Sequence, residues 1–272
     1  MWRFAVQASL VPGTSFREQF ELLARWGYDG IEVSGADLLH HTGELRQAMQ
    51  ESPVTVTSAC AGFEGWLVDR NPRARNLAIA QIKAMLAAGA ELATAGLISP
   101  AAYGIDSRGV LPPYRSAFTL EEDRALLIDS LRQIVESAER TGGTLLLEPL
   151  NRYVDRVLNS LEEAVSVIEE IGSPVIRLIP DFFHMNIEEA DIAASLRRHA
   201  AHIGHVHLSD SNRLLPGRGH IDFASGFAAL RDAGYDGAFA IECRVTGDPE
   251  ELLPQALAFL RRAASQTPAT GP

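Results

Sequence analysis

Short runs of apolar and β-branched residues alternate with longer amphipathic segments along the whole chain. The short runs predict β-strands, and the longer runs, in which apolar residues recur about every three to four positions, predict helices. Strands that are separated by helices are typical of a parallel sheet with crossover connections. The predicted strands span residues 3–10, 30–34, 54–60, 92–98, 144–148, 175–181, 204–208 and 238–243.

Helix boundaries between these strands have recognisable signals. The segments 15–18 and 160–163 each place serine three residues before glutamate, as in a capping box. Asp248 and Pro249 form an N-cap followed by a proline at the first helical position. Glycines at 27, 142, 172 and 234 follow the apolar periods, as C-terminal caps do.

Eight strand–helix units in 272 residues have an average length close to that of a (β/α)₈ barrel. The fold class predicted is therefore α/β, a single (β/α)₈ TIM barrel over residues 1–264, with residues 265–272 as a disordered tail. The segment 100–118 is too long and too rich in turn residues for an ordinary connection. We interpret it as a loop that covers a site at the mouth of the barrel.

Composition narrows the function classes. The formal net charge of −11 disfavours binding to nucleic acid or to an anionic membrane. No apolar run reaches the roughly 18 to 20 residues that a membrane span needs, and the N-terminal segment lacks a signal-peptide core. Only two cysteines, Cys60 and Cys243, are present and they are far apart, which is typical of a reducing compartment. We expect a cytoplasmic protein.

Polar side chains end four consecutive predicted strands. These residues are Glu148, Asp181, His207 and Glu242, and each interval between them is about one strand–helix unit. Because active sites of such barrels lie at the carboxyl ends of the strands, we expect the four side chains to converge. An isolated strand-end carboxylate is more often a helix cap or a surface ion pair, but four in phase favour a functional site.

Two glutamates, one aspartate and one imidazole form a ligand set for one divalent ion, of which Mn²⁺, Co²⁺, Mg²⁺ and Zn²⁺ are candidates. Three carboxylates this close together would repel one another, and a cation is the simplest way to keep all of them ionised. Side-chain alternation also predicts which residues fill the barrel interior below the site: Leu146, Ile179, His205 and Ala240.

Three further candidates are weaker. Glu32, at the end of the second strand, can reach the rim of the site as a substrate contact or form an ion pair with a neighbouring strand. Trp66 is a candidate substrate-binding residue because it, like Tyr103 and Tyr114, can form an apolar wall for a sugar. Single aromatic residues in loops also serve as packing anchors. Cys60 is more consistent with a small buried hydrophobic residue than with a nucleophile.

Four segments together resemble the xylose isomerase-like TIM barrel superfamily, and within it the branch of D-tagatose 3-epimerases and sugar phosphate isomerases/epimerases. They are LEPLNRY (147–153), DFFHMN (181–186), HVHLSDSNR (205–213) and PGRGHID (216–222). The resemblance covers most of the chain and is densest over residues 145–242.

This resemblance implies a metal-dependent isomerase or epimerase of a ketose or sugar acid, which moves a proton through a metal-stabilised enediolate. It implies one Mn²⁺-like ion on Glu148, Asp181, His207 and Glu242, with Glu148 and Glu242 as the catalytic acid and base. The other two positions implied, His184 and Arg218, contact substrate oxygens. The resemblance also favours a homodimer or homotetramer.

One position departs from the pattern of the ketohexose epimerases. A glutamate that grips the first hydroxyls of the substrate is expected after the Asn-Arg-Tyr segment, but Val154 stands there. Asp155 or Arg156 is an alternative contact, and an arginine in this role favours a carboxylate or phosphate on the substrate.

Three other functions remain open. A dehydratase of a cyclic polyol or keto acid uses the same proton abstraction but expels water. A non-catalytic sugar-binding barrel would bind its ligand without turnover. An abasic-site endonuclease is disfavoured, because its three-zinc cluster needs histidines on the third and fourth strands, and residues 58–60 and 94–96 contain none.

Overall fold

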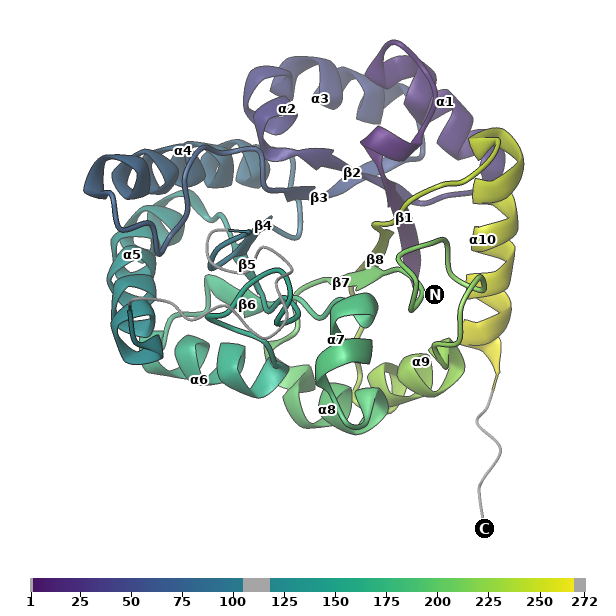
Figure 1. Cartoon of the computed structure of the whole chain (residues 1–272). Coiled ribbons are helices and arrows are strands. Elements are labelled where there is room, and N and C mark those ends of the chain that lie inside the picture. Colours follow the sequence, from purple (N-terminus) through teal and green to yellow (C-terminus); the bar gives the residue numbers. More distant parts are fainter. Residues whose placement is uncertain (1, 105–117, 267–272) are drawn as a thin grey trace.

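A computed structural model describes residues 2–104 and 118–266, and within them the strands form one parallel sheet. The sheet order is β6-β5-β4-β3-β2-β1-β8-β7 (Figure 1). The strands are β1 (Arg3–Gln7), β2 (Gly30–Ser34), β3 (Thr55–Cys60), β4 (Leu97–Pro100), β5 (Leu145–Glu148), β6 (Ile176–Leu178), β7 (Val206–Leu208) and β8 (Ala238–Ile241).

The two ends of this sheet meet. Isolated parallel bridges join Leu178 to Ile203 and Asp181 to His207. The backbone N–H of Gly204 donates to the carbonyl of Leu178 at 2.9 Å, and that of His207 donates to Pro180 at 2.9 Å. These contacts close the strands into a ring, so the predicted (β/α)₈ barrel is confirmed.

Helices surround the strands on the outside (Figure 1). They are α1 (Phe16–Trp26), α2 (Gly35–His40), α3 (Thr42–Glu51), α4 (Pro72–Glu91), α5 (Leu120–Thr141), α6 (Leu161–Ile171), α7 (Phe182–Glu188), α8 (Ile192–His199), α9 (Phe223–Asp232) and α10 (Pro249–Ser265). Short 3₁₀ turns occur at Ala8–Leu10 and Ala200–His202.

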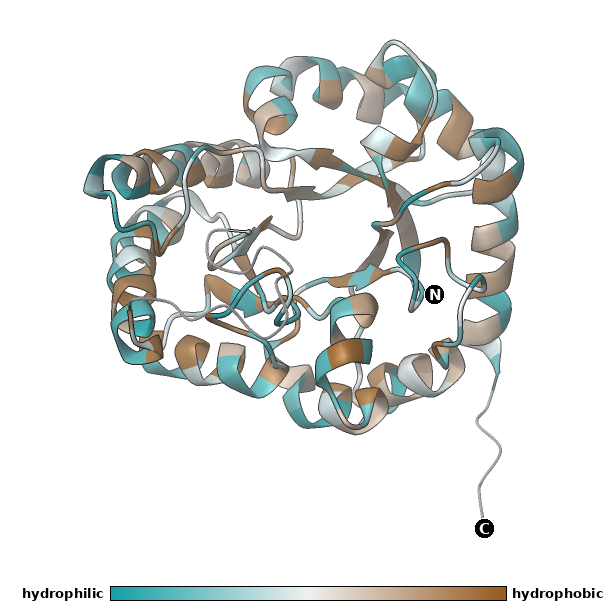
Figure 2. Cartoon of the chain, viewed as in Figure 1, coloured by the Kyte–Doolittle hydropathy of each residue, from teal (hydrophilic) through white to brown (hydrophobic). Residues whose placement is uncertain are grey.

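The predicted caps are present at several helix ends. Ser160 and Glu163 form a complete capping box on α6, and the side chain of Asp248 accepts from Glu250 N before Pro249 of α10. Gly172 ends α6 in the left-handed conformation that glycine adopts without strain. In Figure 2, polar and apolar segments alternate along the outer helices, as expected for helices with one face on the barrel.

Several predicted strands are longer than the observed ones; the sixth ends at Leu178 and not at residue 181, and the seventh begins at Val206 and not at residue 204. The first strand ends at Gln7, because residues 8–10 turn into a 3₁₀ helix. The fourth begins at Leu97, not at residue 92, because Leu92 is buried at the end of α4 and the following turn has positive φ at Ala93 and Gly96. A Cβ at Gly96 would lie 2.4 Å from the carbonyl oxygen of Thr144.

The barrel interior contains a separate apolar cluster of Ile98, Leu146 and Ile179, all fully buried. His205 and Ala240 are also fully buried, so the four residues predicted to lie below the site are inside the protein. Outside the strands, an aromatic cluster packs between β1, β8 and the helices. Phe227 of α9 lies at its centre, 5.2 Å from Phe239 between ring centroids.

Within residues 2–104 and 118–266, no helix is both long enough and apolar enough to span a membrane. Tyr114, most of the predicted loop over residues 100–118 and the predicted tail beyond Gln266 lie outside the described residues. The last helix ends at Ser265, next to the predicted boundary of the barrel.

The aromatic cluster gives a stability prediction. Phe227 is fully buried and its ring meets those of Trp2, Phe4 and Phe239. We expect Phe227→Ala to lower the free energy of unfolding by about 3–5 kcal/mol, because it leaves a cavity in a packed core. Urea titration, monitored by circular dichroism, measures the free energy of unfolding. Leu77→Ala, at a position 42% exposed, is the control and should change it by less than about 0.5 kcal/mol; equal effects would contradict the assignment of the core.

Candidate active site

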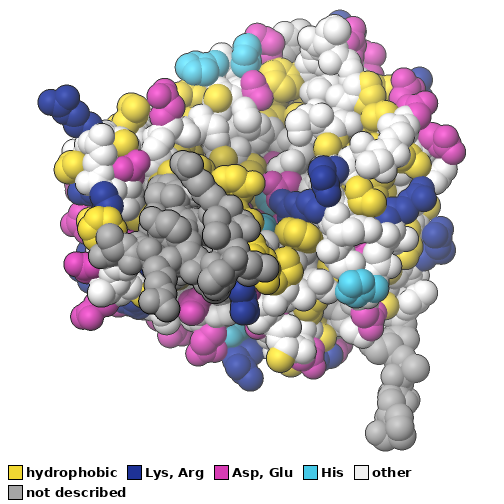
Figure 3. Space-filling view, in the orientation of Figure 1, with side chains coloured by type: hydrophobic (Ala, Val, Ile, Leu, Met, Phe, Trp, Pro, Cys, Tyr) yellow, Lys and Arg dark blue, Asp and Glu magenta, His cyan; other side chains and the backbone are white. Residues whose placement is uncertain are grey.

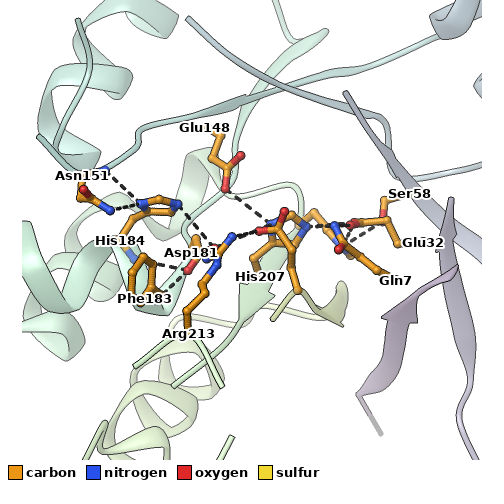
Figure 4. A network of polar contacts seen from close by, with 12 residues as sticks. Gln7, Glu32, Ser58, Glu148, Asn151, Asp181, Phe183, His184, His207 and Arg213 are labelled. Atoms are coloured by element: carbon orange, nitrogen blue, oxygen red, sulfur yellow. Dashed lines mark hydrogen bonds and ion pairs between the residues drawn. The ribbon is translucent and has the colours of Figure 1, made fainter. Parts of the chain in front are cut away.

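The four strand-end residues come together at the mouth of the barrel. Glu148 is the last residue of β5, His207 lies in β7, and Asp181 and Glu242 follow β6 and β8. One ligand atom from each lies within 4.8 Å of the others. Figure 4 shows Glu148 and Asp181 beside His207. The neighbouring strands therefore deliver the set of side chains that the sequence spacing predicts.

His207 lies at the centre of this cluster. Its Nδ1 atom is 3.3 Å from Glu242 Oε2, 3.5 Å from Glu148 Oε1 and 4.0 Å from Asp181 Oδ2. Asp181 and His207 are fully buried, and Glu148 is nearly so. Burial alone would lower the pKa of His207, but the surrounding carboxylates outweigh it and raise the pKa well above its ordinary value.

The cluster fits a divalent cation. Glu148 Oε1 and His207 Nδ1 face each other, both are buried, and neither has a hydrogen-bond partner. Buried polar atoms without partners are rare, and here they belong to an oxygen and nitrogen donor set suited to a borderline divalent ion. Burial raises the pKa of Glu148 and His207 lowers it, and the result is a pKa of about 7. A bound cation would lower this pKa, because it favours the charged carboxylate.

Behind His207, Glu32 holds the other ring nitrogen. Both oxygens of the Glu32 carboxylate lie 3.0 Å from His207 Nε2. Glu32 also accepts from Ser58 Oγ at 2.7 Å and from Gln7 Nε2 at 3.0 Å. Burial raises the pKa of Glu32, but the neighbouring imidazoles of His207 and His205 lower it by a larger amount. The pKa is therefore below its ordinary value, and the carboxylate stays ionised. A carboxylate on the second nitrogen of an imidazole fixes its tautomer and its orientation toward a metal.

Arg213 is a site residue that the sequence reasoning missed. Its guanidinium donates to Asp181 Oδ2 at 2.6 Å and also to Glu242 Oε2, and its Cζ lies 4.9 Å from the centre of the Phe183 ring. Burial would lower the pKa of Arg213, but Asp181 and Glu242 raise it. The residue ends the HVHLSDSNR segment, and its position in a polar loop just after a site strand is the signal that could have identified it.

Three comparisons with known proteins agree with this geometry. A family model described as "Xylose isomerase-like TIM barrel" matches residues 20–263. The chain belongs to the xylose isomerase-like TIM barrel family. The resemblance noted from the sequence is therefore confirmed at the level of the family.

Named relatives in this family are sugar epimerases. The chain is 38% identical to the 3-dehydro-D-guloside 4-epimerase of Escherichia coli (strain K12) over 245 residues, which is 90% of this chain and 93% of that protein. It is 28% identical to a D-psicose 3-epimerase of Ruminiclostridium cellulolyticum over 235 residues, 84% of this chain and 78% of that protein.

Among solved structures, the apo form of a 3-keto-D-glucoside 4-epimerase from E. coli matches with a TM-score of 0.92 at 36% identity. The match covers 96% of this chain and all of that chain. These relatives confirm the prediction of an isomerase-class enzyme and support activity on a small-molecule sugar.

Of the predicted substrate contacts, His184 lies next to the four-residue cluster. It is buried in α7 with Nε2 3.9 Å from Asp181 Oδ2. Its Nδ1 lies 2.9 Å from the backbone nitrogen of Asn151 and 2.8 Å from the side-chain nitrogen of Asn151. Because a backbone N–H can only donate, Nδ1 is the acceptor and the ring proton is on Nε2, toward the site. Burial lowers the pKa of His184, which keeps the ring neutral.

The structure does not bring Arg218 to the cluster. Arg218 is exposed, and its backbone carbonyl accepts from Asn212 Nδ2. Its side chain lines a small cavity beside Phe259 of α10. Trp66 packs against Phe63 and Tyr103, with ring centroids 5.6 and 6.2 Å away. The role of both residues in substrate binding stays a prediction.

The loop after β5 carries Asp155 and Arg156, the two alternative substrate contacts considered because Val154 replaces the expected glutamate. Arg156 pairs with Asp123 of α5 and donates to the carbonyl of Phe118 at 2.9 Å. Asp155 is buried and accepts from the backbone nitrogens of Arg156 and Val157 at 2.6 and 3.0 Å. Both side chains therefore have structural partners that hold the loop.

Figure 3 shows how the site opens at the surface. Near the centre of this face, acidic and histidine side chains are visible at depth beside basic side chains. Mixed charges at the opening, on a protein with a net charge of −11, fit a small polar ligand better than a nucleic acid.

The contact between Glu32 and His207 gives a prediction for metal affinity. We expect Glu32→Gln to weaken the affinity for Mn²⁺ by about 10- to 100-fold, because the imidazole loses the charge that orients it. Isothermal titration with Mn²⁺ at fixed pH measures this. Glu91→Gln is the control, since Glu91 is 61% exposed in an ion pair with Arg46. Equal affinities in the two variants would show that Glu32 does not support the site.

Asp155 gives a prediction for the pH dependence of stability. Burial raises the pKa of Asp155 to about 7, whereas an unfolded aspartate has a pKa of about 3.9. Between these values the folded state binds more protons than the unfolded state, so the free energy of unfolding falls as the pH rises.

We therefore expect Asp155→Asn to gain stability relative to the parent protein as the pH is raised from about 5 to about 8, by about 1–3 kcal/mol. Urea unfolding at the two pH values measures this difference. Asp129→Asn, at an exposed position of α5, is the control and should follow the parent protein at both pH values. A parallel pH dependence of Asp155→Asn and the parent protein would rule out a buried, protonated Asp155.

Proposed function

We propose that this protein is a metal-dependent sugar epimerase or isomerase that moves a proton at a carbon next to a carbonyl group. The observation that carries the proposal is the convergence of Glu148, Asp181, His207 and Glu242, with two glutamates from different strands in one buried cluster. Cytoplasmic location and assembly into homodimers or homotetramers stay predictions.

The four residues of the cluster would hold the cation, and Mn²⁺ is the ion we propose for this mixed oxygen and nitrogen set, with Co²⁺, Mg²⁺ or Zn²⁺ as alternatives. When bound, the ion would supply positive charge against the carbonyl and neighbouring hydroxyl oxygens of the substrate as negative charge develops on them. Asp181 and His207, which are fully buried, would hold it without taking part in proton transfer.

Glu148 and Glu242 are the two groups available to move the proton. They end β5 and follow β8, and β6 and β7 lie between these strands around the ring. Epimerisation needs a proton acceptor on one face of a planar intermediate and a proton donor on the other. Carboxyl groups on separated strands are suited to these two roles, and isomerisation needs only that the proton return to the adjacent carbon.

Two further side chains would stabilise the developing charge on the substrate. His184 presents Nε2–H toward the site and remains neutral, so it can donate a hydrogen bond to a substrate oxygen. Arg213 carries a permanent charge next to Asp181 and Glu242. We therefore propose Arg213 as a basic substrate contact.

The names of the relatives support a proposal for the class of substrate. One is named a 3-dehydro-D-guloside 4-epimerase and another a D-psicose 3-epimerase. In each name a keto sugar is inverted at one carbon atom. We propose a keto sugar as the substrate here as well, with the inverted carbon next to the carbonyl.

The test is exchange of carbon-bound hydrogen with solvent. We expect the Mn²⁺-loaded protein, incubated in D₂O with a panel of ketoses and 3-dehydro sugars, to place deuterium at the carbon next to the carbonyl. Glu148→Gln should lower this rate by about 100- to 10,000-fold, because it removes a proton-transfer group. NMR measures the position of the deuterium, and mass spectrometry confirms that no water is lost.

Two variants make this result specific. Glu91→Gln changes a glutamate on the outer surface and should exchange at the parent rate. His207→Ala should fail to retain the metal, whereas Glu148→Gln should keep most of its affinity. Normal exchange by Glu148→Gln would remove Glu148 from proton transfer, and loss of water from the product would indicate a dehydratase instead.

A further inference from the structure

A cavity at the amino-terminal end of the barrel shares no residue with the candidate active site. It lies between the start of β1 and the helices α9 and α10 (Figure 1), and its volume is about 460 Å³, within the range of ligand pockets in proteins. We call it the β1–α10 pocket. The residues that line it are Trp2, Phe4, Arg231, Arg261, Ala264 and Ser265. The candidate active site lies at the opposite, carboxyl ends of the parallel strands.

The first strand gives the β1–α10 pocket an aromatic wall that is fixed in place. The Trp2 ring lies 5.5 Å from that of Phe227 and 5.1 Å from that of Phe239, and its indole N–H donates to the carbonyl of Tyr235 at 2.7 Å. Phe4 is buried, and its ring stacks 5.5 Å from that of Phe239. Because the indole N–H already has a partner, this wall offers ring surface to a ligand.

The last two helices give the pocket positive charge. Arg231 of α9 donates to the carbonyls of Ala264 and Gln266 at 3.1 and 3.2 Å, and Arg261 of α10 donates to that of Gly27 at 2.6 Å. A guanidinium group has five N–H donors, so these contacts leave donors available on both side chains.

The charge of Arg231 is not balanced by a carboxylate of the pocket. No aspartate or glutamate is among the lining residues. Asp29 Oδ2 lies 3.8 Å from Arg261 Nη2 and partly balances that arginine. Within residues 2–104 and 118–266, Arg231 forms no ion pair, although the whole chain has a formal net charge of −11. A cation at the edge of an apolar cavity attracts an anion that can also cover the apolar surface.

We propose that the β1–α10 pocket is a binding site for a small organic monoanion in which a short chain joins an aromatic ring to a carboxylate. The ring packs against Trp2 and Phe4, and the carboxylate accepts hydrogen bonds from Arg231, with Arg261 beside it. A neutral molecule would leave Arg231 without a counter-charge, and an anion without a ring would leave the aromatic wall uncovered. This site is independent of the proposed function.

A ligand in this pocket would connect the two ends of the chain. Trp2 and Phe4 belong to the first segment, whereas the other lining residues belong to the last two helices. The pocket therefore exists only in the folded protein. A ligand that binds the folded state alone stabilises it by an amount that grows with the ligand concentration.

Titration of the protein with three compounds, in the presence of diamagnetic Mg²⁺, tests the proposal without turnover. 3-Phenylpropionate is the probe, 3-phenylpropionamide is its neutral counterpart, and propionate lacks the ring. We expect 3-phenylpropionate to shift the indole N–H signal of Trp2 in ¹H–¹⁵N spectra, where Trp2→Phe identifies that signal. The signal of Trp66, in the loop after β3 at the other end of the barrel, should stay in place.

The other two compounds should bind at least about tenfold more weakly than 3-phenylpropionate. The amide loses the charge-assisted hydrogen bonds, and propionate loses the buried ring. The dissociation constants come from the concentration dependence of the Trp2 shift.

A pair of arginine variants tests the charge. Arg231→Gln removes the charge, while its amide can still donate to the carbonyls at the end of α10. It should raise the Kd for 3-phenylpropionate at least about tenfold and remove the preference over the amide. Arg262→Gln is the matched control, because Arg262 is an exposed arginine in the last turn of α10 that lines a different cavity. It should bind 3-phenylpropionate as the parent protein does.

A pair of serine variants tests the space. Ser265→Phe places a ring in the pocket and should abolish the Trp2 shift, whereas Ser166→Phe, at an exposed position of α6, should keep it. Thermal unfolding gives a second measurement. Saturating 3-phenylpropionate should raise the Tm of the parent protein and of both control variants, but not that of Arg231→Gln or Ser265→Phe.

Four results would overturn the proposal. They are the absence of a Trp2 shift, a shift of Trp66 without one of Trp2, equal affinities for the acid and the amide, and an unchanged Kd in both Arg231→Gln and Ser265→Phe. Deuterium exchange into a sugar does not enter any of these measurements. The β1–α10 pocket and the proposed function therefore stand or fail separately.

Discussion

Mutual repulsion among the carboxylates at the barrel mouth is the constraint around which this site is built. Glu148, Asp181 and Glu242 surround the Nδ1 atom of one buried imidazole. The protein itself supplies positive charge through Arg213, which donates to Asp181 and Glu242 from the loop after β7. The unpartnered atoms of Glu148 and His207 mark the side of the cluster where a cation fits.

The same contacts that form the site also close the barrel. The bridge between Asp181 and His207 is one of two that join β6 to β7, and both residues are predicted ligands. Backbone hydrogen bonds across this junction fix the height of the two side chains relative to each other. Because two of the predicted ligands lie where the barrel closes, the geometry of the site depends on that closure.

The two sides of the barrel mouth supply different groups of side chains. The strands β5 to β8 and the residues that follow them supply the four side chains of the candidate metal-binding cluster. The strands β1 to β3 supply Glu32, which orients His207, and residues that line the cavity next to it.

Hydrophobic periodicity and strand spacing by themselves determined the parallel barrel. They also determined the four residues that converge in it, because each strand–helix unit places one strand end at nearly the same height along the barrel axis. Which groups meet across the ring was decided only by the tertiary structure. Glu32 lies far from His207 in sequence, and their contact depends on how the ring closes. Arg213, not Arg218, reaches the cluster because the backbone turns at Arg213 with a φ of 59°, a local conformation that no periodic pattern encodes. The cavity lined by Gln7, Phe16 and Cys60 likewise exists only where residues from three strands and two helices meet in space.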